Sequence, residues 1–265
     1  MIEWWLLLKA VIMGIVEGLT EFLPISSTGH LIVIGELLNF TGERAKTFEI
    51  FIQLGAILGV MWHYRAKIAH LTTRLHTPKT RRFALNVLIA FLPAAVVGLA
   101  AHRYIKDYLF DPRTVAVALI VGGFVILWIE RMSFKVRAQA VEDISTAQAF
   151  KVGIAQMCAL FPGVSRAGAT IMGGLVAGLS RTTATEFSFF LAMPTMLAAT
   201  LYDLYANRNA LMPGDAMLFG VGFLTAFVAA VVVVRLFLQY VARHNFTFFA
   251  YYRIVFGTLV LLYFL

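Results

Sequence analysis

Long apolar runs separated by short polar segments dominate the hydropathy pattern of this chain. A helix needs about 20 mostly apolar residues to cross a bilayer. Five runs approach that length, at 84–101, 115–129, 187–201, 217–238 and 246–265. The pattern predicts an all-α integral membrane protein with at least five crossing helices, or about six if each half of the chain has three.

Composition supports the same fold class. The chain is 60% hydrophobic and 14% charged, with a mean hydropathy of +0.83, which lies outside the range of ordinary soluble domains. The formal net charge of +8 would suit a nucleic-acid binder, but the basic residues fall in short segments between apolar runs. That distribution orients membrane proteins, so we expect membrane lipids around the chain and no nucleic-acid partner. Cys158 is the single cysteine, which excludes a disulfide framework and a thiolate metal site.

The basic segments also predict a topology. Residues 63–82 carry six Lys and Arg side chains and no acid. Cytoplasmic loops of membrane proteins carry an excess of basic residues, so this segment is expected in the cytoplasm. Counting spans from there places residues 131–146 on the same side.

The two halves of the chain resemble each other. A shift of 139 residues, without a gap, superposes glycine, serine and aromatic positions of the first half on identical residues of the second: Gly14 on Gly153, Phe22 on Phe161, Ser26 on Ser165, and Phe48 on Phe187. Duplications of this kind determine the architecture of many membrane proteins. We therefore expect one membrane domain over residues 1–265, with a first repeat at about 1–138 and a second at about 139–265.

Each repeat contains an apolar block broken by Pro, Gly and Ser, at 19–35 and at 158–178. Irregular backbone at membrane depth is tolerated only where protein or a water-filled cavity satisfies it. Each block is therefore expected to form a re-entrant helix, loop and helix. With three crossing helices per half, an odd number, the second repeat would be inverted relative to the first. The two loops would then enter from opposite faces and meet near the middle of the membrane, where inverted-repeat folds place their ligand sites.

Two carboxylates stand out in the first block. Glu17 and Glu21 are four residues apart, hence on one face of a helix, where like charges repel. A divalent cation, which prefers carboxylate oxygens, would relieve that repulsion. The alternative is a protonated or hydrogen-bonded Glu that fixes helix packing.

Three hydroxyls, a glycine and a histidine follow in the same block, as Ser26, Ser27, Thr28, Gly29 and His30. A glycine allows close backbone approach, hydroxyls donate hydrogen bonds, and a following helix can present free N–H groups to an anion. This suits a phosphate cradle, although Ser and Thr before a helix are more often plain N-caps. His30 alone fits a ligand and a buried polar residue equally well.

The second block supplies a cation. Arg166 is the only charged residue between Lys151 and Arg181. An arginine in the bilayer centre costs roughly 2.5 to 3.5 kcal/mol on the most lenient scale, so it requires an anionic partner. Its planar fork of donors matches phosphate. The alignment of the halves places Ser27 opposite Arg166, so the acids lie in one repeat and the cation in the other. Together they form a set of groups suited to phosphoryl transfer.

Two motifs carry a specific resemblance. The run from Glu17 to His30 reads Glu-x-x-x-Glu followed by Pro-x-Ser-Ser-Thr-Gly-His, and the run from Pro162 to Thr170 reads Pro-Gly-x-Ser-Arg-x-Gly-Ala-Thr. With them, essentially the whole chain resembles the undecaprenyl-diphosphate phosphatase family of the bacitracin-resistance type. Ala167 departs from the motif, which has a serine after the arginine, and the departure affects only a secondary phosphate contact.

The resemblance implies a function and a location. It implies hydrolysis of undecaprenyl diphosphate, a prenyl diphosphate lipid, to the monophosphate carrier of peptidoglycan synthesis, and thereby bacitracin resistance. It also implies a multi-pass protein of the bacterial inner membrane, an active site that faces the periplasm, and dependence on a divalent metal such as Mg²⁺ or Ca²⁺. The main alternative is a prenyl-phosphate flippase or transporter that uses the same anion site. The oligomeric state stays open, a homo-oligomer included.

Roles follow residue by residue. Glu17 and Glu21 would hold the metal, or one of them would act as general base. Ser27 is the first choice of nucleophile, with metal-activated water as the alternative and His30 as proton carrier. Arg166 is expected to bind the phosphate and stabilise its developing charge. The other expected phosphate contacts are Ser26, Thr28, Ser165 and Thr170.

Overall fold

The computed structural model describes residues 4–108, 111–206 and 215–265. Within these ranges the chain is helical apart from turns, irregular segments such as residues 133–137, and one isolated β-bridge between Ala138 and Leu179. The α-helices are α1 (Trp4–Thr20), α2 (Ser27–Leu37), α3 (Glu43–His63), α4 (Arg65–Thr73), α5 (Pro78–Tyr108), α6 (Pro112–Arg131), α7 (Thr146–Met157), α8 (Arg166–Val176), α9 (Arg181–Ala206), α10 (Ala216–Val241) and α11 (Thr247–Tyr263). Two short 3₁₀ helices, η1 (Val141–Asp143) and η2 (Cys158–Leu160), complete them.

Five of these helices are long and apolar enough to cross a membrane, at Glu43–His63, Pro78–Ala101, Pro112–Arg131, Arg181–Tyr205 and Ala216–Val241. The prediction of an all-α, multi-pass membrane protein is confirmed. The set differs from the predicted one at two places. The span Glu43–His63 begins with charged residues, so its run was not among the five predicted, and the C-terminal run forms a shorter helix, Thr247–Tyr263.

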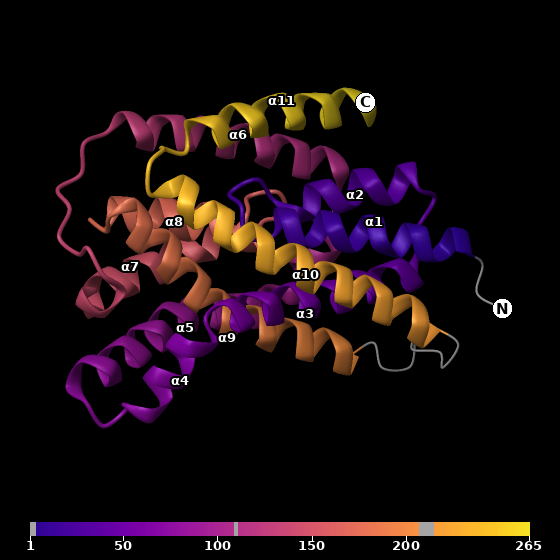
Figure 1. The fold of residues 1–265 in the computed structure, drawn as a ribbon. Helices are drawn as coiled ribbons and strands as arrows, with labels where there is room; N and C mark the ends of the chain where they lie inside the picture. The colour runs from indigo at the N-terminus through magenta and orange to yellow at the C-terminus, as the bar shows by residue number, and fades with distance from the viewer. Residues whose placement is uncertain (1–3, 109–110, 207–214) are drawn as a thin grey trace.

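The two interrupted blocks fold as hairpins. In the first, α1 and α2 pack together and are joined by a turn at residues 21–26. In the second, α7 packs on α8, and η2 and a turn at 161–165 join them. Figure 1 shows α1 and α2 toward one end of the helix bundle and α7 and α8 toward the other, with the connecting loops near its centre. The broken helices expected from the Pro and Gly pattern are therefore present.

Helices of the two halves pack reciprocally. In α1, a Cβ atom added to Gly14 would lie 2.5 Å from the carbonyl oxygen of Gly222 in α10. In α7, a Cβ on Gly153 would lie 2.7 Å from the carbonyl oxygen of Ala90 in α5. Glycine thus permits both backbones to approach closely. Since Gly14 and Gly153 are equivalent in the alignment of the halves, each hairpin packs on a long helix of the other half.

The basic segment, residues 63–82, contacts the segment 131–146. Lys67 in α4 forms ion pairs with Glu142 at 3.2 Å and with Glu186 at 2.9 Å. Arg82 in α5 donates to the carbonyl oxygen of Glu142 at 2.8 Å. The two segments predicted on the same side of the membrane therefore do lie at the same end of the bundle.

Candidate active site

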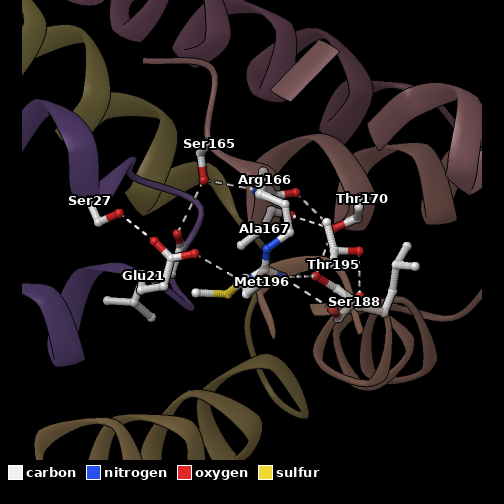
Figure 2. Close-up of polar contacts among 12 residues, drawn as sticks. Glu21, Ser27, Ser165, Arg166, Ala167, Thr170, Ser188, Thr195 and Met196 are labelled. Carbon is white, nitrogen blue, oxygen red and sulfur yellow. Dashed lines mark hydrogen bonds and ion pairs between the residues drawn. The ribbon is translucent and has the colours of Figure 1, made fainter. Parts of the chain in front are cut away.

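The two hairpin loops meet and bring acid and cation together. Ser165 Oγ, in the second loop, donates to the carbonyl oxygen of Leu23, in the first, at 3.4 Å. Arg166 Nη2, at the start of α8, lies 3.3 Å from Glu21 Oε1. Figure 2 shows Glu21 between Ser27 on one side and Arg166 on the other. The structure therefore joins groups that the sequence separates by 145 residues.

Both loops end in a strained serine. Ser26 has a φ of 68° and Ser165 a φ of 73°, in a region that residues with a side chain rarely occupy. Each serine directly precedes a helix, so each sets the direction of the next side chain, Ser27 in α2 and Arg166 in α8. Ser165 Oγ accepts from the Gly168 N–H at 3.1 Å, as a helix cap does. Backbone strain of this kind persists where surrounding structure fixes it, and it clusters at functional sites.

The Glu21 carboxylate accepts one hydrogen bond at each of its two oxygens. The Ser27 hydroxyl donates to Oε2 in a short hydrogen bond, and Arg166 donates to Oε1. The side chains of Arg166 and Glu21 are 11% and 10% exposed, so the pair is shielded from solvent but still reachable. A hydroxyl bonded to a carboxylate that a third group orients is the arrangement of an activated nucleophile.

Arg166 is anchored from α9 and α8. Its Nη1 donates to the Ser188 carbonyl oxygen at 3.1 Å and to Ser188 Oγ at 3.4 Å. Thr170 Oγ1 shares a 2.6 Å hydrogen bond with Ser188 Oγ and donates to the Arg166 carbonyl oxygen at 2.8 Å. Nε of Arg166 is buried and has no hydrogen-bond partner among the described residues. The guanidinium is thus held in place, and Nε is the one donor atom for which the described residues supply no acceptor.

Glu17 is fully buried in α1, one helical turn before Glu21. Neither of its carboxylate oxygens has a hydrogen-bond partner among the described residues. Because buried polar groups are almost always satisfied, an orphaned carboxylate beside a second one fits a cation ligand. Since no cluster of three metal-binding side chains occurs in the described ranges, other ligands would have to come from substrate oxygens or water.

Among the described residues, no side-chain hydrogen bond joins His30 to Ser27, Glu21 or Arg166. Its Nδ1 lies 2.7 Å from the Ser26 carbonyl oxygen, and its Nε2 lies 2.7 Å from the Tyr252 hydroxyl of α11. The ring also stacks on Phe256 at 4.2 Å. A carbonyl oxygen only accepts, so Nδ1 carries the proton and Nε2 accepts from Tyr252 when the ring is neutral. In this geometry His30 supports the first loop, and its expected proton-carrier role would have to run through Tyr252.

The remaining predicted contacts divide into two groups. The hydroxyls of Ser26 and Thr28 form no hydrogen bond with other described residues. Ser165 and Thr170 use their hydroxyls to hold the second loop and Ser188. The direct phosphate contacts expected for all four residues remain predictions.

Sequence reasoning did not single out three functional neighbours: Ser188, Tyr252 and Arg253. Ser188 looks like any hydroxyl in a spanning helix. Arg253 carried a signal, because it is a charge within the apolar run 246–265, and charges at membrane depth are functional candidates. Its side chain is 1% exposed and contacts both loops.

Comparison with known proteins identifies the family of the chain. A family model described as "Bacitracin resistance protein BacA" matches residues 10–259, a range that includes both loops. The chain belongs to this family. Similar curated proteins carry the name undecaprenyl-diphosphatase. One from Nitrosospira multiformis is 57% identical over 261 residues, covering 98% of this chain and 96% of its own length.

Two further proteins of this name show similar identity. A protein of the same name from Janthinobacterium sp. is 58% identical over 262 residues, covering 97% of this chain and 95% of its own length. Another from Pseudomonas fluorescens is 55% identical over 258 residues, with coverage of 97% and 94%. Ala167, the one departure from the expected motif, is fully buried in the hydrophobic core.

Proposed function

We propose that this chain is an undecaprenyl-diphosphatase, which hydrolyses undecaprenyl diphosphate to undecaprenyl phosphate and inorganic phosphate. The observation that carries the proposal is the contact of Ser27, Glu21 and Arg166 across the two hairpins. This hydrogen-bonded group supports the roles proposed for its members: Ser27 as nucleophile, Glu21 as base and Arg166 as phosphate-binding cation. The lipid diphosphate is the form implied in bacitracin resistance. By converting it to the monophosphate, the chain would confer that resistance.

The residues divide the reaction between them. Ser27 Oγ attacks the terminal phosphorus, its proton passes to Glu21, and the bond from phosphorus to the bridging oxygen breaks, so that undecaprenyl phosphate leaves. Water then hydrolyses the phosphoserine to free phosphate and serine. Direct attack by water, oriented by Ser27, gives the same products. Arg166 binds the phosphate oxygens and stabilises charge as it develops in the transition state.

A divalent cation, Mg²⁺ or Ca²⁺, would be held by Glu17 and Glu21. Such an ion neutralises charge on phosphate oxygens. The orphaned oxygens of Glu17 support this assignment. Glu21 would then exchange part of its contact with Arg166 for the cation, while Arg166 turns its donors to the substrate.

The chain would work in the bacterial inner membrane with its site open to the periplasm. The basic segment at 63–82 supports a cytoplasmic end, since such segments face the cytoplasm. The long prenyl chain would stay among membrane lipids while the diphosphate enters between the loops.

Phosphate release tests the proposal. Purified protein in detergent, supplied with undecaprenyl diphosphate and Mg²⁺, is expected to yield one inorganic phosphate and one undecaprenyl phosphate per substrate. The control is Glu21→Gln, which keeps the shape of the side chain and removes its charge. Absence of phosphate release, together with movement of labelled prenyl phosphate across proteoliposomes, would instead establish the flippase.

A further inference from the structure

Arg253 of α11 makes a buried connection between the two active-site loops and a third element. Its side chain is 1% exposed, and no ion pair joins it to a carboxylate within the described ranges. Its guanidinium instead donates to backbone carbonyl oxygens of the first loop, the second loop and α6. The five acceptors are Leu119 (3.2 Å) for Nε, Pro24 (3.1 Å) and Val164 (2.9 Å) for Nη1, and Ala118 (3.2 Å) and Gly163 (3.0 Å) for Nη2.

This set uses the full capacity of the side chain. A guanidinium has five N–H donors in a fixed plane, and five hydrogen bonds are formed. Pro24 and Gly163 are equivalent positions in the two halves, so one side chain bonds the same point of both loops. Pro24 and Gly163 each lie two residues before a strained serine, Ser26 or Ser165, and Val164 directly precedes Ser165. The orientation of Ser27 and Arg166, the residues that follow, therefore depends on these bonds.

We propose that Arg253 is a positioning residue that fixes the two loops against each other, so that Ser27, Glu21 and Arg166 reach reacting geometry. This inference rests on the proposed phosphatase function for its kinetic consequence, although the loop geometry can be tested without it. Reacting groups displaced by about 1 Å can cost 100-fold in rate. Lysine has three donors around one nitrogen and cannot bond all three elements in one plane. Arg253→Lys therefore retains the buried charge but no longer aligns the two loops with each other.

The kinetic test compares two arginines that connect α6 with the C-terminal segment 247–264. Arg113 in α6 also donates to a carbonyl oxygen of the C-terminal segment, that of Phe264 at 3.0 Å, but at an exposed position. For Arg253→Lys we expect kcat to fall by about 100-fold with KM changed less than about threefold, because the lost alignment serves the transition state. Arg113→Lys should keep both constants. A merely structural Arg253 would lower the melting temperature and leave kcat per folded molecule unchanged, which would overturn the proposal.

A second variant tests the proposal even if Arg253→Lys fails to fold. A Cβ atom added to Gly122 in α6 would lie 2.1 Å from Arg253 Nη2, so Gly122→Ala displaces the guanidinium without removing it. Gly220 in α10 has no atom within 4 Å of an added Cβ and gives the matched control, Gly220→Ala. We expect the loss of kcat from Gly122→Ala alone. Equal activity of the two glycine variants would contradict the proposal.

A distance measurement separates the positioning role from the chemistry. Leu37 ends α2 and Val176 ends α8, and both side chains are exposed. Spin labels at Leu37→Cys and Val176→Cys, with Cys158→Ala, should give one narrow distance distribution that Arg253→Lys broadens and Arg113→Lys leaves narrow. A distribution unchanged by Arg253→Lys would overturn the proposal. Wild-type protein that releases no phosphate would overturn only the proposed function, because the distance data would still test Arg253.

Discussion

Replacement of Arg166 by lysine separates phosphate binding from structural pairing. The guanidinium donates to Glu21 at 3.3 Å, to the two oxygens of Ser188 at 3.1 and 3.4 Å, and to Met196 Sδ at 3.5 Å. An ammonium can keep the attraction to Glu21 but cannot hold Ser188 and a phosphate oxygen in the same plane. Loss of a donor aimed at transition-state charge costs about 100- to 1,000-fold in kcat, or roughly 2.7 to 4 kcal/mol. We expect a loss of this size for Arg166→Lys.

Stability has to be measured on the same samples. Removal of one partner from a buried ion pair costs roughly 3 to 5 kcal/mol, so Arg166→Ala should lower the melting temperature as well as turnover. Arg166→Lys retains the charge and should melt closer to wild type. Arg181 offers a control outside the site: it pairs at 2.5 Å with Glu130, and the two side chains are 46% and 4% exposed. Arg181→Lys should lower the melting temperature and keep phosphate release per folded molecule.

The assay is inorganic phosphate release and thermal melting of one detergent-purified preparation per variant. A catalytic Arg166 predicts that activity falls far more in Arg166→Lys than in Arg181→Lys, whatever their melting temperatures. An Arg166→Lys enzyme that melts early but turns over within about threefold of wild type would refute the reasoning, and would make Arg166 a structural partner of Glu21.

Three further predictions test the metal, the nucleophile and the topology. Chelation should abolish phosphate release, and Glu17→Gln should raise the Mg²⁺ concentration needed for half-maximal activity; full activity after thorough chelation would exclude the metal. Ser27→Ala should remove any acid-stable phosphoenzyme formed from labelled substrate and lower turnover at least about 100-fold, whereas near-normal turnover would favour direct attack by water. Single cysteines at Lys79 and Met217, in a Cys158→Ala background, should react with an impermeant reagent from opposite faces, and reaction of both from the same face would rule out the inverted arrangement.

The sequence predicted the members of the central contact for a physical reason. Charges in apolar blocks are costly unless paired, so Glu21 and Arg166 had to find partners, and the 139-residue offset suggested that the blocks meet. The structure brings both residues to one hydrogen-bonded group with Ser27. The broken helices also followed from the Pro, Gly and Ser pattern.

Other features depend on tertiary contacts that local patterns do not encode. His30 Nε2 forms a hydrogen bond with the hydroxyl of Tyr252. The two residues are 222 positions apart in the sequence, so no spacing rule relates them. Ser188 becomes part of the site only because α9 lies beside α8. The span Glu43–His63 was missed because charges at its start dilute its hydropathy. Arg253 could have been singled out by the same burial argument that identified Arg166, but its acceptors are backbone carbonyls, which no sequence motif reveals.

The central claim is that loops from the two halves form one catalytic site, and a double-mutant cycle of Glu21→Gln and Arg166→Lys tests it most directly. The kcat/KM for phosphate release would be measured for wild type, both single variants and the double variant. Residues that act as a unit are strongly non-additive, so the double variant should lose little more than the worse single variant, with a coupling energy between about 0.5 and 3 kcal/mol. Losses that simply multiply, with a coupling energy below about 0.5 kcal/mol, would contradict a shared site.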